Sequence, residues 1–355
     1  MSDPDALDGL PTPERRQRAL GHDAARAAIL SQLAENRLPG AILLHGPQGI
    51  GKASFAFEMA AAILTATGDE DGQRVAEQIA SLSHPNLFLV RRTLNKTGSK
   101  ISANIAVDQI ARRDSGDSHP LRDRLHQTRG RSGFRVAIID SIDDLTPSAA
   151  NALLKILEEP PPETIFLLVS HRPGQLLPTI RSRCHSVALR PLGDELLRAI
   201  LTEQDPALGP AEIDRAIALA RGRPRRAFET LALEPESTLG ALQAWLSDPA
   251  RHPPSIGLQL AEALGADPAS TELTFAREML DDWMADEARN AAMQPGNRMR
   301  LASATELWDK AHALFADADS INLDMKQTLV AIFDAIGKHV SSYDSTPAPV
   351  STEPL

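Results

Sequence analysis

The sequence predicts an α/β domain built on a parallel sheet, followed by two all-helical parts. Between about residues 40 and 190, short apolar runs that are typical of buried strands alternate with helical patterns. Beyond residue 194 no further strand-like run occurs, and helical periodicity continues to about residue 340. The hydrophobic content is 42% and only 4% of the residues are aromatic, and the apolar residues are mostly Ala and Leu, which favour helices.

The length of 355 residues is enough for two or three domains, each with its own core. We place the α/β domain at residues 1–190, a small helical domain at 191–238 and an all-helical domain at 239–340. The last stretch, 341–355, is rich in Ser, Thr and Pro and is predicted to be a disordered tail.

The charge and the cysteine content exclude several classes of protein. The formal net charge of -10 argues against a surface that coats duplex DNA, although a local basic face remains compatible with it. The single cysteine, Cys184, excludes an internal disulfide and any site with several thiolate ligands. With no signal peptide and no run of membrane-spanning length in the sequence, the prediction is a cytoplasmic protein.

The elements of the α/β domain follow from local signals. An irregular arm over residues 1–20, broken by Pro11 and Pro13, is expected to extend along the body of the domain. The first helix spans 22–36 and is stopped by Pro39-Gly40, and another spans 148–159 after the capping pair Thr146-Pro147. The predicted strands are the apolar runs 41–44, 87–90, 136–139, 164–169 and 187–189.

The first predicted strand runs into Gly46-Pro-Gln-Gly49-Ile-Gly51-Lys52, which has the spacing of a phosphate-binding loop. Glycines let a bare backbone curl around a phosphate, and the helix that follows directs its free N–H groups at the anion. Lys52 adds a cation near the β and γ phosphates. Gly46, Gly49, Gly51 and Lys52 are therefore candidate nucleotide-binding residues, and the alternative is a glycine turn that binds nothing.

Two groups needed for nucleotide hydrolysis are missing from this pattern. The residue after the lysine should carry a hydroxyl for the metal ion, but it is Ala53. Ser54 is kept as a candidate contact, although one step along a helix turns a side chain by about 100°. The strand 136–139 ends at Asp140, the candidate acid for magnesium, but the next residue is Ser141, which cannot act as a base toward water.

A third cluster, Arg181-Ser182-Arg183-Cys184, follows the strand 164–169. Arginines at such a place are most often ordinary surface residues. The alternative is an arginine finger, a side chain that reaches into another subunit's nucleotide and neutralises charge in the transition state. Composition alone leaves both interpretations open.

Several long motifs resemble one known family. They are Ser148–Pro161, Thr164–Ser170 and Leu177–Cys184. Together they resemble the core of bacterial clamp-loader subunits, which belong to the AAA+ class of P-loop ATPases. The resemblance covers roughly residues 20–235 and implies that the small helical domain is a lid. The helical remainder, with the motif at 322–329, resembles the collar domain through which such subunits form a ring.

Within this family the motifs are most similar to the delta-prime branch of the DNA polymerase III clamp loader. The resemblance implies a hetero-pentamer with tau/gamma motor subunits and a delta subunit, which opens the sliding clamp and seats it on primed DNA. It also implies a component of the polymerase III holoenzyme with no polymerase or ATPase activity of its own. By the same resemblance Arg183 is the finger in trans, Ser170 senses the γ-phosphate, and Arg225 touches nucleotide from the lid. For Arg225 a solvated helix arginine is the open alternative.

The resemblance further implies ATP or ADP with Mg²⁺ as a weakly bound or vestigial cofactor. Many relatives carry a four-cysteine zinc module, but the stretch 65–90 has no cysteine, so no metal site is expected. A run of arginines lies between residues 112 and 135, and three interpretations are open: a surface toward DNA, a surface toward a partner, or a solvated surface of mixed charge. The alternative functions are a tau/gamma-type motor that hydrolyses ATP, and another AAA+ remodeller such as a helicase loader.

Overall fold

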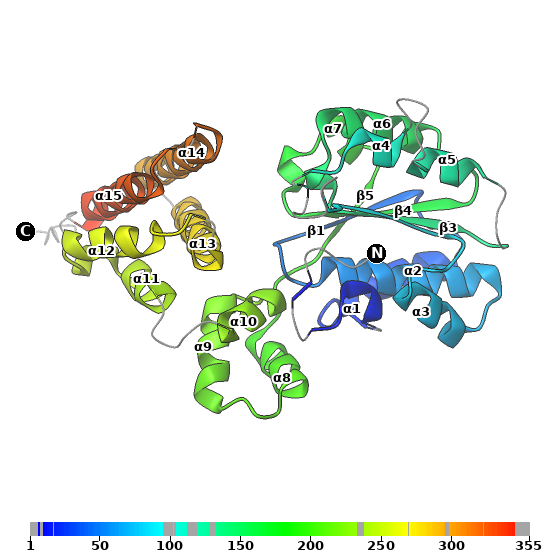
Figure 1. The fold of residues 1–355 in the computed structure, drawn as a ribbon, viewed down its shortest axis with the longest axis horizontal. Helices are drawn as coiled ribbons and strands as arrows, with labels where there is room; N and C mark the ends of the chain where they lie inside the picture. The colour runs from blue at the N-terminus through cyan, green and yellow to red at the C-terminus, as the bar shows by residue number, and fades with distance from the viewer. Residues whose placement is uncertain are drawn as a thin grey trace, which may run out of the picture. The chain divides into compact units, whose positions relative to one another are not determined.

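The chain forms two compact units, Met1–Ala232 and Leu233–Leu355 (Figure 1). The tail predicted at 341–355 is wrong for residues 341–344, which end helix α15 (Met325–Asp344), and residues 345–355 lie outside the described residues. Four arginines of the predicted basic run also lie outside them: Arg112, Arg113, Arg129 and Arg131. The structure, a computed structural model, describes residues 6–7, 10–16, 18–94, 102, 104–111, 119–127, 132–232, 238–268, 270–294, 298–321 and 323–344.

The first unit is built on a five-stranded sheet in which every strand pair is parallel, as the sequence predicts. The strand order across the sheet is β2-β3-β4-β1-β5. Strand β1, which leads into the glycine loop, therefore lies between β4 and β5. The strands are β1 (Ala41–His45), β2 (Leu87–Arg91), β3 (Arg135–Asp140), β4 (Thr164–Ser170) and β5 (His185–Ala188).

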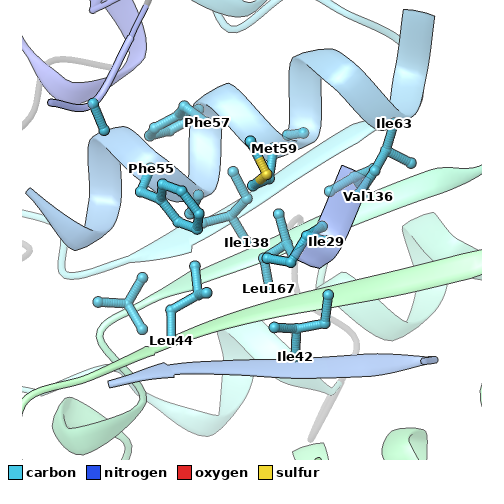
Figure 2. Close-up of a cluster of buried hydrophobic side chains, with 14 of the residues drawn as sticks. Ile29, Ile42, Leu44, Phe55, Phe57, Met59, Ile63, Val136, Ile138 and Leu167 are labelled. Atoms are coloured by element: carbon cyan, nitrogen blue, oxygen red, sulfur yellow. The ribbon is translucent and has the colours of Figure 1, made fainter. Parts of the chain in front are cut away.

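Helices cover both faces of this sheet, which explains why its central strands are apolar throughout. Because successive side chains of a strand point to opposite faces, Ile42 and Leu44 enter one core and Ala41 and Leu43 enter the other. Figure 2 shows the first core, where the alternate residues of the strands meet Phe55, Phe57 and other side chains of α2.

One face carries α1 to α3 and the opposite face carries α4 to α7 (Figure 1). The predicted start of α6 is confirmed, because the Thr146 hydroxyl accepts a hydrogen bond from the Ala149 amide at 3.3 Å and Pro147 is the first helical residue. The helices are α1 (Asp23–Ala34), α2 (Lys52–Gly68), α3 (Gly72–Ala80), α4 (Val107–Ile110), α5 (Leu121–His126), α6 (Pro147–Glu158) and α7 (Pro178–Arg181).

The last strand differs from the prediction. It lies at His185–Ala188 rather than at 187–189; it is an edge strand with exposed side chains, so its residues lack the apolar pattern. Strand β3, which carries Asp140, is separated from the P-loop strand by β4. The short helix α4 is a single turn.

Three further helices form a small layer with its own apolar core in the same compact unit. Leu197, Leu201 and Ala216 are fully buried in this core. These helices correspond to the predicted lid, whose boundaries at 191 and 238 stay predictions. The helices are α8 (Asp194–Gln204), α9 (Pro210–Ala220) and α10 (Pro224–Leu231).

The second unit is helical throughout its described residues, as predicted for the collar. Its first two helices are separated where the prolines at 249, 253 and 254 interrupt the helical pattern. Trp245 packs edge-on against Phe333 in its core, with ring centroids 5.1 Å apart. None of the helices in the described ranges combines the length and apolar character that a membrane span needs. The helices are α11 (Thr238–Ser247), α12 (Pro254–Leu264), α13 (Thr271–Met293), α14 (Arg298–Ile321) and α15 (Met325–Asp344).

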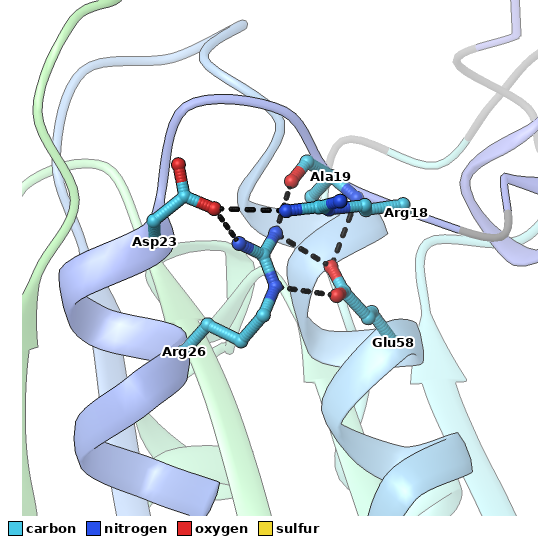
Figure 3. A network of polar contacts seen from close by, with 5 residues as sticks. All are labelled: Arg18, Ala19, Asp23, Arg26 and Glu58. Carbon is cyan, nitrogen blue, oxygen red and sulfur yellow. Dashed lines mark hydrogen bonds and ion pairs between the residues drawn. The ribbon is translucent and has the colours of Figure 1, made fainter.

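A polar network joins the N-terminal arm and α1 to α2, the helix that follows the P-loop (Figure 3). Arg26 of α1 donates two hydrogen bonds to the Glu58 carboxylate, at 2.6 and 3.2 Å, and a third to the Ala19 carbonyl. Glu58 also accepts the Ala19 amide at 2.9 Å. The Glu58 hydrogen bond raises the pKa of Arg26, so this pair stays charged.

The Glu58→Ala variant should lose about 2–4 kcal/mol of unfolding free energy, because it leaves the mostly buried Arg26 without its bidentate partner. The side chains of Arg26 and Glu58 are only 12% and 14% exposed. The matched control is Glu35→Ala, whose partner Arg37 is exposed, and its expected cost is below about 1 kcal/mol. Denaturant unfolding followed by circular dichroism measures the unfolding free energy of both variants. Equal losses in the two variants would contradict a large stabilising contribution from the Arg26–Glu58 pair.

Candidate functional site

The glycine loop has the strand-loop-helix geometry that its sequence predicts. Strand β1 ends at His45, α2 begins at Lys52, and Gly46, Gly49 and Gly51 have φ angles of 151°, 80° and 96°. Such positive φ angles favour glycine. At Gly46 a side chain is also excluded by space, because a Cβ atom would lie 2.2 Å from the Leu189 carbonyl oxygen.

Lys52 lies folded onto the loop that precedes it. Its ammonium group donates hydrogen bonds to the carbonyls of Gly46 at 2.7 Å and Pro47 at 2.6 Å, and the residue is only 3% exposed. Burial lowers the pKa of Lys52 to about 7, although the nearby carboxylates of Asp140 and Asp143 oppose the shift. The charge of this lysine is therefore set by what occupies the site.

Four parts of the first unit meet around a cavity of about 230 Å³ at the P-loop. They are the N-terminal arm, the loop with the start of α2, the carboxyl ends of β3 and β4, and the lid. This position fits the general rule that ligands bind beyond the carboxyl ends of parallel strands. The predicted site residues that line the cavity are Gly49, Gly51, Lys52, Ser54, Asp140 and Arg225, and Ala53 and Ser141 line it as well.

The lid is bonded directly to the loop through the predicted residue Arg225. The Arg225 amide donates to the Gly49 carbonyl at 3.1 Å, and its guanidinium pairs with Glu229 at 2.8 Å. A second contact to the loop was not predicted: His22, at the cap of α1, lies with Nε2 2.9 Å from the Ile50 carbonyl, which requires that nitrogen to donate. A single histidine has no local sequence signal that would reveal this contact.

The acidic residues after β3 hold the end of β4. In the turn η2 (Ile142–Asp144), the Asp143 carboxylate accepts from the Ser170 hydroxyl at 3.0 Å and from the amides of His171 and Arg172 at 2.5 and 3.2 Å. Ser170 is fully buried by this contact and is not among the residues that line the cavity. Its role as a γ-phosphate sensor stays a prediction.

His171, which was not predicted as a site residue, lines the cavity. Burial first, and the positive charge of Lys52 second, lower the pKa of His171 to about 4, so the imidazole is neutral at pH 7. Its Nδ1 atom is buried and has no hydrogen-bond partner among the described residues. Asp144, nearby, pairs with Arg92 at 3.3 Å, and burial raises its pKa.

The candidate finger Arg183 lies just after α7 and is not part of the described lining of its own cavity. Its guanidinium donates to the Thr179 carbonyl at 2.9 Å and pairs with Glu158 at 2.8 Å, with 37% of the side chain exposed. The neighbouring Cys184 thiol donates to the Ile180 carbonyl, and burial raises its pKa to about 11. The thiol is therefore protonated and unsuited to nucleophilic chemistry.

The stretch that replaces the cysteine module of many relatives forms the end of α2, the helix α3 and the turn into β2. Within the described ranges, no group of three or more His, Cys, Asp or Glu side chains is arranged to hold a metal ion. Asp140, the predicted acid for magnesium, lines the cavity.

Comparison with known proteins agrees with this geometry. Residues 21–193 match the family model described as "DNA polymerase III, delta subunit". A delta' subunit of Pseudomonas aeruginosa is 35% identical over 194 residues, which are 52% of this chain and 53% of that protein. A delta' subunit of Bacillus subtilis is 31% identical over half of each chain.

Other relatives carry a different subunit name. The gamma/tau subunit of Mycobacterium tuberculosis is 31% identical over 224 residues, which are 62% of this chain and 37% of that protein. The matched region thus spans about half of the length of these delta' relatives and 37% of the length of the gamma/tau relative. Among solved structures, a gamma subunit-related protein of Thermotoga maritima is similar at 16% identity with a TM-score of 0.40, over 88% of this chain and 99% of that chain.

The affinity of this site for ATP should fall by at least about tenfold between pH 7 and pH 9. The folded protein loses the Lys52 proton near pH 7, whereas a bound polyphosphate requires the charged form, so raising the pH weakens binding. Equilibrium titration with ATP at several pH values measures the effect. The Lys52→Gln variant should bind weakly with little dependence on pH over this range, and an equally steep profile in that variant would exclude Lys52 as the cause.

Proposed function

We propose that this chain is a delta-prime-type subunit of the DNA polymerase III clamp loader and acts in DNA replication in the cytoplasm. In this role it is a ring member that does not hydrolyse ATP. It completes the ATP site of a neighbouring motor subunit and so helps to load the sliding clamp on primed DNA. The family match over residues 21–193 and the delta' relatives at 31–35% identity support this proposal.

The observation that carries the proposal is the contrast between Arg183 and the chain's own cavity. The cavity presents Ala53 where a metal-binding hydroxyl is needed and Ser141 where a base is needed. Arg183, in contrast, is partly exposed, and among the described residues it contacts Glu158 and a backbone carbonyl. A guanidinium in this position has the reach and the charge of a finger for another subunit's nucleotide.

The chain's own cavity holds ATP or ADP, with or without Mg²⁺, but does not cleave it. Gly46, Gly49, Gly51 and Lys52 form the phosphate cradle in this proposal. Ser54 and Asp140 flank it, Arg225 contacts the nucleotide from the lid, and Ser170 is the γ-phosphate sensor that the family resemblance implies. The partners are tau/gamma motor subunits and a delta subunit in a hetero-pentamer, assembled through the helical second unit as a collar.

The second candidate is a tau/gamma-type motor subunit. One observation favours it: the gamma/tau relatives align over 62% of the chain, a longer stretch than the 52% of the first delta' relative. Ala53 and Ser141 argue against a motor subunit. Hydrolysis of ATP needs a metal-binding hydroxyl at the first position and a base for water at the second. Nothing in the site specifically favours a helicase loader or another AAA+ remodeller.

In a loader reconstituted with tau/gamma and delta subunits, Arg183→Ala should lower the ATPase rate stimulated by clamp and DNA by at least about tenfold. Arginine fingers contribute roughly 10³–10⁵ in rate at the site they serve. The matched control is Arg181→Ala, an exposed arginine on the same turn, which should leave the rate within about twofold. An unchanged rate in the Arg183 variant, with the complex still assembled on size exclusion, would refute the finger.

The same reconstitution separates the two candidate functions. Lys52→Ala in this chain should leave the stimulated ATPase of the complex largely unchanged if the chain does not hydrolyse ATP. If the chain is a motor, the purified protein alone turns over ATP and Lys52→Ala abolishes that turnover.

A further inference from the structure

The N-terminal arm is fixed to the first unit at two points that flank Arg16. Glu14, in the turn η1 (Pro13–Arg15), pairs with Arg91 at the end of β2 at 3.5 Å, and both side chains are buried. Three residues beyond Arg16, the Ala19 amide is bonded to Glu58 of α2 at 2.9 Å. Arg16 is therefore held between two anchored positions rather than on a free strand of chain.

Arg16 lines the P-loop cavity and is half-buried there. Its guanidinium makes no ion pair with a described residue and donates no hydrogen bond to one. Burial lowers the pKa of Arg16, and no described carboxylate opposes the shift. A desolvated arginine is rare without a partner, because water is lost and nothing in the protein replaces it.

The other cations of the cavity are engaged within the protein. Arg18 pairs with Asp23 at 3.0 Å, Arg92 with Asp144 at 3.3 Å and Arg225 with Glu229 at 2.8 Å. Lys52 donates to two loop carbonyls. Within the described ranges, Arg16 is thus the lining cation that has its five donors left for a ligand.

We propose that Arg16 binds the phosphates of the nucleotide in this cavity, supplying from the N-terminal arm the positive charge that a metal ion held at position 53 supplies elsewhere. A guanidinium binds phosphate oxygens through paired hydrogen bonds and carries its charge without a hydroxyl ligand. Nucleotide binding here therefore depends little on Mg²⁺. This inference rests on the part of the proposed function in which the cavity holds nucleotide.

The test compares Arg16→Gln with Arg15→Gln in the full chain, by equilibrium titration with ATP in Mg²⁺ and in EDTA. Arg15 is the matched control, since it precedes Arg16 on the same arm but is exposed and does not line the described cavity. The Kd of wild type for ATP should differ by less than about threefold between the Mg²⁺ and EDTA buffers. In EDTA, the affinity of Arg16→Gln for ATP should be at least about tenfold lower than that of wild type, because a hydrogen bond from a charged group is lost. Arg15→Gln should bind ATP as wild type does.

Thermal unfolding without nucleotide provides the second readout. Arg16→Gln should be at least as stable as wild type, because it removes a buried charge that has no partner in the free protein. Stabilisation by added ATP should then be smaller in Arg16→Gln than in wild type or in Arg15→Gln. Adenosine, which has no phosphate, should bind all three proteins alike.

Three results would overturn the proposal. They are equal ATP affinities in the two variants, an equal loss of adenosine and ATP binding in Arg16→Gln, and no saturable ATP binding by wild type. None of these results bears on the proposed role of Arg183, because the Arg183→Ala experiment measures ATP hydrolysis at the site of another subunit. Failure of one proposal is therefore distinguishable from failure of the other.

Discussion

The site depends on how the backbone carbonyls of the P-loop are bonded. The Lys52 ammonium group donates hydrogen bonds to the carbonyls of Gly46 and Pro47. The Arg225 amide donates to the Gly49 carbonyl, and the His22 ring donates to the Ile50 carbonyl. Each donor comes from a different place in the chain: the loop's own lysine, the lid and the cap of α1. A loop rich in glycine has high backbone freedom, so these bonds, rather than side-chain packing, give it one conformation.

In the proposed function, the chemistry of an ATP site is divided between two chains. With alanine at position 53 and serine at position 141, this chain lacks two groups for cleavage, whereas the glycines and Lys52 keep the geometry of a phosphate cradle. Arg183, the arginine proposed to act on another chain's nucleotide, lies just after the short helix α7.

Local pattern was sufficient for the fold class but not for the order of the strands. Alternation of strands with helices identified the parallel sheet, yet the insertion of β4 between β1 and β3 follows from long-range packing that no single segment encodes. The glycine loop and Asp140 were singled out from motifs and Arg225 from the family resemblance, and Gly49, Gly51, Lys52, Asp140 and Arg225 line one cavity. His22, His171 and Arg16 were not found, because their importance arises from contacts across the fold and a lone residue carries no periodic signal.

In the proposed finger role, Arg183 has to exchange its counter-ion. Its guanidinium pairs with the Glu158 carboxylate of its own chain at 2.8 Å, and it must leave that carboxylate before it can bind a phosphate. Both side chains are partly exposed, so the pair is worth no more than about 1 kcal/mol. A phosphate group with a higher negative charge can therefore displace Glu158 at little cost in free energy.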